Sequence, residues 1–374
     1  MGSNTGPPSG RLFTIDDAPG AGRGVFASRD LAAGKTVLVA NDLSVHVLFR
    51  EYRGEICHNC FAYGFGAKQP VKDADHGLAF CSEQCQRLFA LQSDELCMTA
   101  RAAVEKLIRR RAPSSQPNDT PQGPRPTPEE IGSAWEIADI QTTLIRGGRL
   151  GTPGRPNVPP PPPATKAALR GLQRALSTPV APDVISFLLA AVLANYNSYQ
   201  IAAASAVPWA RLQDLEDDPA PYLSARELDE YIAAYLHLLA TLPVALLPFV
   251  SRTILHATKS RETYNSFGIR SLDDEGVEFF GYGVWPSASY FNHSCGPNLA
   301  RKRDGRAWVF SAGRDIKAGE QLYISYVNGG TSELCSSSGE VVGWKDRAGL
   351  LKKTWGFDCV CQKCKQEALS YVTS

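Results

Sequence analysis

The sequence predicts an α+β protein in which strand-rich segments at both ends of the chain enclose a helical middle. Three observations support this fold class. Residues 11–50 alternate Gly-rich turns with short β-branched runs, and strand signals return at 265–326, notably in AWVFSAG and QLYISYV. Residues 166–260 have helical patterns, including the capping-box sequence SARE at 224–227. Ten cysteines fall into an early and a late group, which is typical of metal binding in a reducing compartment.

The composition excludes several classes of protein. The chain has 374 residues, with 39 basic and 38 acidic side chains and 43% apolar residues. With charges so nearly balanced, the protein as a whole has no strong electrostatic attraction to nucleic acid or to a membrane surface. The first residues, MGSNTGPPSGR, are polar and contain no secretory signal. We therefore expect a protein of the nucleus, the cytoplasm or both, with reduced thiols.

The longest apolar run, residues 184–207, could be read as a membrane span or as a buried helix. It contains Asn195, Asn197 and Gln200. Three amides would be costly in hydrocarbon, so the sequence favours a buried helix and no contact with a membrane.

The segments between the strand-rich ends differ in character. Ser82 is a plausible N-cap for a helix that continues to about Arg111. Residues 112–130 and 147–165 are rich in Pro and Gly, which predicts a spacer with polyproline II character, although recognition by SH3 or WW domains is an alternative. A short amphipathic segment lies between these two stretches, and a short helix is expected near 345–354.

The early cysteines have the spacing of a zinc site. Cys57 and Cys60 form a C-x₂-C knuckle on a tight turn. Cys81 and Cys85 are four residues apart, which puts them on one side of a helix. Four thiolates at about 2.3 Å make a closed tetrahedral Zn²⁺ site. The alternative ligands nearby are His58 and His76.

The late group is incomplete by itself. Cys359, Cys361 and Cys364 supply three thiolates within six residues, so a zinc ion there needs a fourth ligand from elsewhere. The candidates are Cys295, Cys335 or a histidine.

Four stretches, in the expected order, resemble the SET domain of protein lysine methyltransferases. GRGVFA (22–27) is similar to the family's G-x-G-x-x-A motif, and NHSCGPN (292–298) to its N-H-S-C-x-P-N motif. AGEQLYISY (318–326) resembles the G-E-E-L-x-x-x-Y ending, and FDCVCQKC (357–364) the post-SET zinc tail. The resemblance implies the SET-domain β-fold.

The early cysteines interrupt this SET-like sequence, as in the SMYD subfamily, where a MYND zinc finger is inserted at that point. CQRLF at 85–89 and YNSFGI at 264–269 are similar to the subfamily's signatures. A full MYND finger holds two zinc ions. Here no second C-x₂-C pair follows Cys60, and the usual downstream histidine is replaced by Ser93, which leaves only Cys97. We expect one zinc ion in a truncated finger.

The resemblance implies five segments along the chain. They are the N-terminal part of the SET domain (11–50), a truncated MYND-type finger (51–100), a helical insertion (101–260) with Pro-rich flexible segments (about 112–165), the C-terminal part of the SET domain (261–330) and a post-SET zinc-binding region (331–374).

The resemblance also implies S-adenosylmethionine-dependent transfer of a methyl group to the ε-amine of a protein lysine. Tyr326 would be the catalytic tyrosine. The cofactor would be bound by Gly22, Arg23, Gly24, Asn265, Asn292, His293 and Phe357. Phe267 and Trp355 would line the lysine channel, although the family usually has Tyr at the position of Trp355. Cys295 would complete the tail zinc site, giving two zinc ions in all.

Two other functions remain open at this point. The Trp355 difference and the truncated finger are compatible with an inactive scaffold that recruits protein partners through the finger or the Pro-rich insertion. A DNA-binding regulator is disfavoured by the balanced charge. The substrate would be a histone or another protein.

Overall fold

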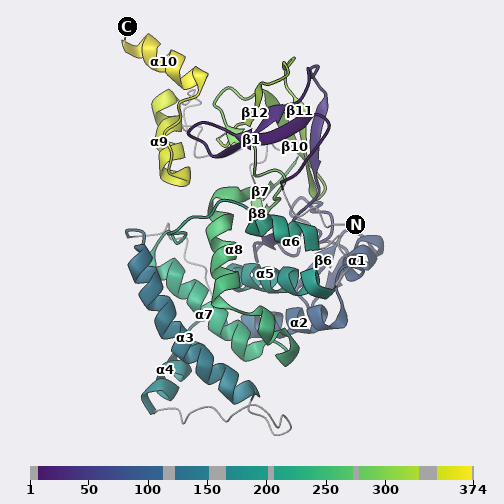
Figure 1. Cartoon of the computed structure of the whole chain (residues 1–374). Coiled ribbons are helices and arrows are strands. Elements are labelled where there is room, and N and C mark those ends of the chain that lie inside the picture. Colours follow the sequence, from purple (N-terminus) through teal and green to yellow (C-terminus); the bar gives the residue numbers. More distant parts are fainter. Residues whose placement is uncertain are drawn as a thin grey trace. The chain divides into compact units, whose positions relative to one another are not determined.

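The computed structural model describes residues 7–112, 123–150, 166–200, 206–272, 278–327 and 343–372 (Figure 1). Cys335, one candidate zinc ligand, lies outside the described residues. The chain divides into two compact units. The first comprises residues 1–44, 210–215 and 264–374, and the second comprises residues 45–209 and 216–263.

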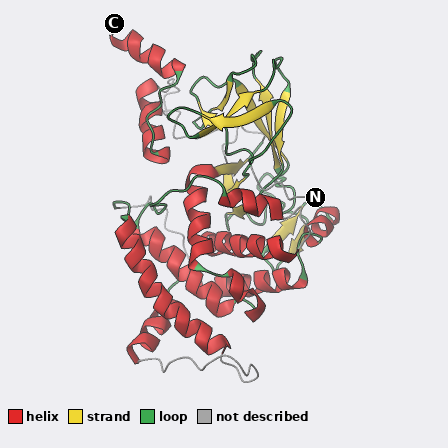
Figure 2. Ribbon diagram, viewed as in Figure 1, coloured by secondary structure: helices red, strands yellow, loops and turns green. Residues whose placement is uncertain are grey.

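The first unit is built from small sheets (Figure 2). One has the strand order β1-β2-β12-β9, and another has the order β10-β11-β3. Strands β7 and β8 form an antiparallel pair. The bounds are β1 Phe13–Asp17, β2 Arg23–Ala27, β3 Thr36–Ala40, β7 Ser266–Arg270, β8 Phe279–Val284, β9 Asn292–His293, β10 Leu299–Asp304, β11 Ala307–Ala312 and β12 Gln321–Ile324.

Strand β12 joins two of the sequence motifs. It pairs antiparallel with β2, which follows the Gly-rich turn, so Leu322 lies opposite Val25. On its other edge β12 pairs in parallel with β9, and Ile324 lies opposite His293. Strand β2 is far from β9 and β12 in the sequence, and parallel strands such as β9 and β12 cannot be joined by a tight turn. The three strands are therefore neighbours only through the tertiary fold. The NHSC turn therefore lies beside the strand that leads to Tyr326.

The chain after residue 343 forms two helices, α9 (Trp344–Trp355) and α10 (Gln362–Val372). Helix α9 ends at Gly356, which adopts a left-handed conformation with φ of 77°. The helix expected near 345–354 is thus present, whereas α10 was not anticipated. Arg347 of α9 forms an ion pair with Glu367 of α10 at 2.6 Å.

The second unit begins with the cysteine-rich segment. It contains strands β4 (Val45–Leu48), β5 (Val71–Asp73) and β6 (Leu78–Phe80), followed by α1 (Glu83–Ala90) and α2 (Glu95–Arg111). Ser82 caps α1 as expected, because its hydroxyl accepts a hydrogen bond from the Cys85 amide at 3.2 Å. The prediction of one helix to Arg111 was wrong. Asp94 is a second N-cap, whose carboxylate accepts from the Cys97 amide at 2.8 Å.

Helices fill the rest of the second unit (Figure 1). Their bounds are α3 Pro128–Leu150, α4 Lys166–Ser177, α5 Pro182–Gln200, α6 Ala206–Gln213, α7 Ala225–Thr241, the 3₁₀ segment η1 Val244–Phe249 and α8 Arg252–Asn265; α6 and α8 run past the unit's limits. Helix α5 lies at the centre, in contact with α2, α7 and η1. The capping box of α7 forms as expected, since the Ser224 hydroxyl accepts from the Glu227 amide at 3.2 Å.

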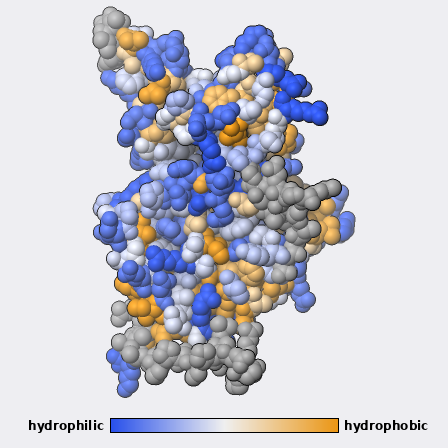
Figure 3. Space-filling model, in the orientation of Figure 1, coloured by the Kyte–Doolittle hydropathy of each residue, from blue (hydrophilic) through white to orange (hydrophobic). Residues whose placement is uncertain are grey.

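One expectation for the middle of the chain needs adjustment and another is confirmed. The short amphipathic segment expected between the two Pro-rich stretches is part of helix α3, which covers residues 128–150 and so extends a few residues into both of those stretches. Trp135 and Ile145 are buried. The long apolar run forms the buried helix α5 up to Gln200. Among the described residues, no helix is long and apolar enough to cross a membrane. Polar and apolar residues are interspersed on the face shown in Figure 3, in keeping with the balanced charge.

Candidate functional site

The early cysteines form a four-sulfur cluster in the second unit. Each of Cys57, Cys60, Cys81 and Cys85 offers a sulfur atom, and these atoms lie within 4.8 Å of one another. The Cys60–Cys81 and Cys81–Cys85 sulfur separations are 3.7 and 3.5 Å. Ligands at about 2.3 Å from a tetrahedral zinc ion are about 3.8 Å apart, so the cluster fits the ion.

The late cysteines form an equivalent cluster in the first unit, and its fourth member is Cys295. The sulfur atoms of Cys295, Cys359, Cys361 and Cys364 lie within 4.8 Å of one another. The Cys295–Cys359 separation is 3.9 Å and the Cys295–Cys364 separation is 3.5 Å. These are again the spacings of a tetrahedral Zn²⁺ site. Of the described His, Cys, Asp and Glu residues, no third group has this geometry.

Cys97 belongs to neither cluster. It is buried in the first turn of α2, and its thiol donates to the side-chain oxygen of Asn197 on α5 at 3.5 Å. Burial raises the pKa of this thiol to about 12, as does its hydrogen bond with Asp94, so it remains protonated near neutral pH. The remaining cysteine of the truncated finger is thus a packing residue between two helices.

His293 connects the tail cluster to the β12 strand. Its Nδ1 accepts a hydrogen bond from the Tyr326 amide at 3.0 Å, which leaves the proton of the neutral ring on Nε2. Nε2 lies 3.2 Å from the sulfur of Cys295. Burial lowers the pKa of the imidazole to about 4, so the ring is neutral near pH 7. Both ring nitrogens are therefore used within the protein, and a cofactor contact from this ring stays a prediction.

Tyr326 packs among residues of the tail. Its ring centroid is 5.4 Å from that of Trp355 and 6.4 Å from that of Phe357. Its hydroxyl donates to the carbonyl oxygen of Phe291 at 2.9 Å. Burial raises the pKa of the phenol to about 12, against a smaller opposing effect of Arg301, so Tyr326 is a neutral hydrogen-bonding group. The structure thus brings the predicted catalytic tyrosine and two predicted site residues together.

The Gly-rich turn has little tolerance for side chains. Gly22 has a φ of 66°, a conformation that favours glycine. A Cβ atom at Gly24 would lie 2.4 Å from Nε2 of Gln321 and 3.0 Å from Nδ2 of Asn292. The Asn292 amide also donates to the carbonyl oxygen of Arg23 at 3.0 Å. Nε2 of Gln321 is buried without a hydrogen-bond partner among the described residues, which leaves a polar donor available beside this turn.

Sequence reasoning missed Asp214, which holds the side chain of Arg23. The Arg23 guanidinium donates to the Asp214 carboxylate at 2.9 Å and lies 4.9 Å from the Tyr290 ring centroid. The Tyr290 hydroxyl donates to the same carboxylate at 3.0 Å. Asp214 follows α6, 191 residues after Arg23, and no local motif marks it.

Asn265 and Phe267 are placed by other neighbours. The backbone carbonyl of Asn265, at the end of α8, accepts from the Ser289 hydroxyl at 3.3 Å. Phe267 on β7 packs against Trp308, with ring centroids 5.5 Å apart. Arg301 was also missed: its guanidinium lies 5.9 Å from the Phe267 ring centroid. A fixed cation therefore lies beside a predicted wall of the lysine channel.

Comparison with known proteins agrees with these motifs. The model of the SET domain family matches residues 22–327. A Saccharomyces cerevisiae protein named "Potential protein lysine methyltransferase SET6" is 26% identical over 96% of this chain and 96% of its own. A SET and MYND domain-containing protein of Dictyostelium discoideum is 39% identical over 32% of this chain and 26% of its own. The mouse histone-lysine N-methyltransferase SMYD3 is 33% identical over 28% of this chain and 21% of its own.

Among solved structures, the SET domain of LSMT bound to lysine and AdoHcy is similar over 84% of this chain and 48% of its own. Its TM-score is 0.23 at 14% identity. The family match covers most of the chain, and the cysteine clusters have the positions of a MYND-type finger and a post-SET tail. The chain belongs to the SET domain family, and its relatives include SET and MYND domain-containing proteins and lysine methyltransferases.

Proposed function

We propose that this protein transfers a methyl group from S-adenosylmethionine to the ε-amine of a lysine in a protein substrate. The observation that carries the proposal is the environment of Tyr326. Its neutral phenol is enclosed by Trp355 and Phe357 and is joined through its amide to His293. Membership of the SET domain family supports this activity, as does the name of the yeast relative.

S-adenosylmethionine, when bound, supplies an electrophilic methyl group on a sulfonium sulfur. The Gly22–Gly24 turn would accommodate its amino-acid portion, since glycine permits close approach of the backbone. Asn292 holds this turn by donating to the Arg23 carbonyl. The Asp214 carboxylate pairs with the Arg23 guanidinium at 2.9 Å beside this turn. Phe357 would stack on the adenine ring.

The lysine must lose its proton before it can act as a nucleophile. For a free lysine with a pKa near 10.4, this costs on the order of 4–5 kcal/mol at pH 7. The aromatic side chains of Phe267 and Trp355 would desolvate the ammonium form, and the nearby Arg301 cation would disfavour it further. The Tyr326 hydroxyl, held by the Phe291 carbonyl, would orient the neutral amine.

The test is methyl transfer from labelled S-adenosylmethionine to histones and to cell-lysate proteins. We expect transfer by the wild-type chain and a loss of at least about 100-fold in Tyr326→Phe, with zinc content and folding unchanged. Ser370→Ala, a change on an exposed side of α10, is the matched control. Equal transfer by wild type and Tyr326→Phe would argue against the role of the tyrosine.

An inactive scaffold is the second candidate, favoured by Trp355, which contacts Tyr326 where the family usually has a tyrosine. Calorimetric titration with S-adenosylmethionine separates the two proposals, because a scaffold that had lost the pocket would give no heat of binding.

The proposal also covers the cellular location of the protein and the kind of protein that it methylates. We propose a nuclear or cytoplasmic protein, since its two cysteine clusters need reduced thiols to bind metal. Its partners would be a histone or another lysine-containing protein, and peptides bound by the finger or the Pro-rich insertion. A mass-spectrometric search for methyl-lysine that disappears on deletion of the protein would identify the target.

A further inference from the structure

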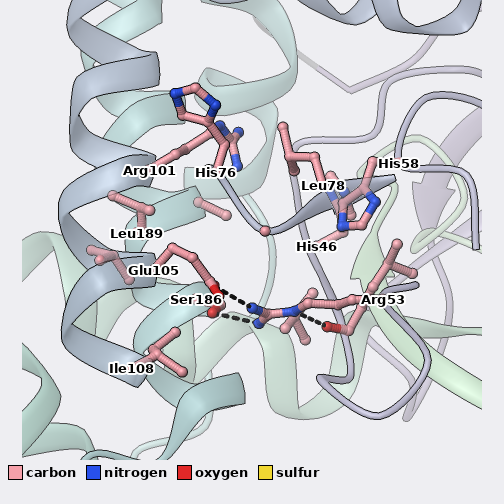
Figure 4. Close-up of a pocket in the computed structure, with 15 residues that line it drawn as sticks. His46, Arg53, His58, His76, Leu78, Arg101, Glu105, Ile108, Ser186 and Leu189 are labelled. Carbon is pink, nitrogen blue, oxygen red and sulfur yellow. Dashed lines mark hydrogen bonds and ion pairs between the residues drawn. The ribbon is translucent and has the colours of Figure 1, made fainter. Parts of the chain in front are cut away.

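A cleft in the second unit has no part in the proposed methyl transfer. It has a volume of about 70 Å³ and is lined by β4, the finger segment and helices α2 and α5 (Figure 4). Its charged lining groups are the guanidinium groups of Arg53 and Arg101 and the carboxylate of Glu105. Three histidines also line it: His46, His58 and His76.

Arg53 is already paired with groups of the protein. Its Nε donates to the Leu48 carbonyl at 3.1 Å, and Nη2 donates to the Ser186 hydroxyl at 2.5 Å (Figure 4). Ion pairs to Asp183 at 3.6 Å and Glu105 at 3.8 Å offset its charge. This arginine is therefore a structural link between the segment after β4 and the helices α2 and α5.

Arg101 is different. Its Nε is buried and has no hydrogen-bond partner among the described residues. Its guanidinium lies 5.2 Å from the Phe89 ring centroid, and within the described part of the chain no carboxylate is within ion-pair distance. Glu105, the carboxylate of the cleft, is shared by Arg53 and Arg109.

In the described part of the chain the Arg101 guanidinium lacks a carboxylate partner, and an arginine does not lose its positive charge by giving up a proton near neutral pH. Burial lowers the pKa of the Arg101 guanidinium, and the neighbouring Arg53 lowers it further, yet arginine remains charged near neutral pH. Arg101 is partly buried, and a cation withdrawn from water without a partner is costly, so a bound anion would remove that cost. Guanidinium groups bind phosphate and carboxylate through paired hydrogen bonds.

The histidines provide further polar groups around the same space. His76 lies close to Arg101 in Figure 4, and its Nδ1 is 2.7 Å from the Asp73 carboxylate, so its Nε2 is left for another partner. His46 and His58 lie across the cleft from Arg101. The lining thus combines one uncompensated cation with several imidazole groups, a combination suited to an oxyanion with several acceptor oxygens.

We infer that this cleft binds a phosphate group, free or as the monoester of a small molecule, with Arg101 as its charge partner. The inference is independent of methyl transfer. A phosphate group offers more acceptor oxygens than a carboxylate, and the cleft volume of about 70 Å³ suits a small anion.

The test is calorimetric titration of the zinc-loaded, full-length protein with inorganic phosphate, with phenyl phosphate and with acetate, at constant ionic strength. We expect binding of one phosphate and a loss of affinity of at least about tenfold in Arg101→Gln. Arg110→Gln, an exposed position on the same helix, should bind as the wild type does. Tighter binding of phenyl phosphate than of phosphate would identify the monoester as the ligand class.

A stability measurement separates this inference from a purely structural arginine. In phosphate-free buffer, Arg101→Gln should melt no lower than the wild type, because it removes an uncompensated cation. If Arg101→Gln does not fold, Arg101→Lys keeps the charge without the paired donors and should bind phosphate more weakly. Equal phosphate affinity in wild type and variant, binding of acetate alone, or no heat with either phosphate compound would overturn the inference.

Discussion

The finger and tail clusters present the same four sulfur donors in different surroundings. In the finger, the Asn59 amide donates to the Cys85 sulfur at 3.5 Å, and the adjoining core consists of Leu78, Phe80 and Phe89. In the tail, His293 lies 3.2 Å from the Cys295 sulfur. The adjoining core there contains Val327 and Leu351, with Tyr326, Trp355 and Phe357 packed against it.

The difference indicates two roles for the same chemistry. Zinc binding energy becomes folding energy wherever the site does not exist in the unfolded chain. In the finger, the energy of bound zinc would order a local core. In the tail, bound zinc would also order the residues around Tyr326, so metal content and methyl transfer should be coupled at one cluster and not at the other.

The largest expected effect comes from removing one ligand in each cluster. Cys295→Ser should lower bound zinc from about two ions to about one per chain and weaken S-adenosylmethionine binding at least about tenfold. Cys57→Ser should lose the same amount of zinc but keep cofactor affinity. Elemental analysis and calorimetry measure both quantities. If the two variants lose cofactor binding equally, the cofactor site depends on both clusters alike.

The dependence of methyl transfer on pH probes the tail side of the comparison. Because the pKa of Tyr326 is raised to about 12, the phenol keeps its proton, and its stabilising contribution is complete below pH 10 and is lost as pH rises from 10 to 12. Since Tyr326 does not change its charge in this range, the pH dependence should come from the substrate lysine. Its neutral fraction, and with it the rate with a lysine peptide, should rise about tenfold per pH unit below the pKa of the bound lysine. Initial rates measured up to pH 9.5 check this; a descending limb within that range would mean that Tyr326 ionises early.

The next effect concerns the packing beside each cluster. Leu351→Ala should destabilise the protein by about 2–5 kcal/mol and also slow methyl transfer, because Leu351 is fully buried in the core that holds Tyr326. Phe89→Ala should cost about 3–5 kcal/mol and leave the rate per folded molecule unchanged. Urea denaturation and activity assays on the same samples make the comparison. A rate loss in Phe89→Ala would show that the finger's packing also matters for catalysis.

The sequence anticipated the parts of the site that depend on short spacings. Zinc ligands must lie close together, so three of the tail cysteines fall within six residues, and the N-H-S-C motif pointed to Cys295. Asp214 was beyond such reasoning, because it reaches Arg23 only through tertiary contacts across 191 residues. The role of His293 depends on the amide of Tyr326, and no pattern in the sequence fixes which nitrogen accepts that bond.

The same limit explains the error at residues 82–111. The apolar pattern continues through the break, and Asp94 resembles any other polar residue of a helix until its carboxylate is seen to cap Cys97. The prediction of the fold class used patterns summed over many residues, so one misplaced helix boundary did not change it.

The smallest effect should come from the helix caps. Ser82 caps α1 and thereby holds the amide of Cys85, a predicted zinc ligand, whereas α9 in the tail follows Gly343 and has no side-chain cap. Ser82→Ala should cost about 1 kcal/mol, because one orphan amide loses its acceptor. Ser82→Asp keeps an acceptor and should restore most of that stability. Competition of each variant with a zinc chelator would reveal the change, with the finger zinc released more readily in Ser82→Ala and the tail zinc unaffected. Equal release from both clusters would mean that the cap acts on the whole chain, and the finger would then not be the independently ordered element that its local core suggests.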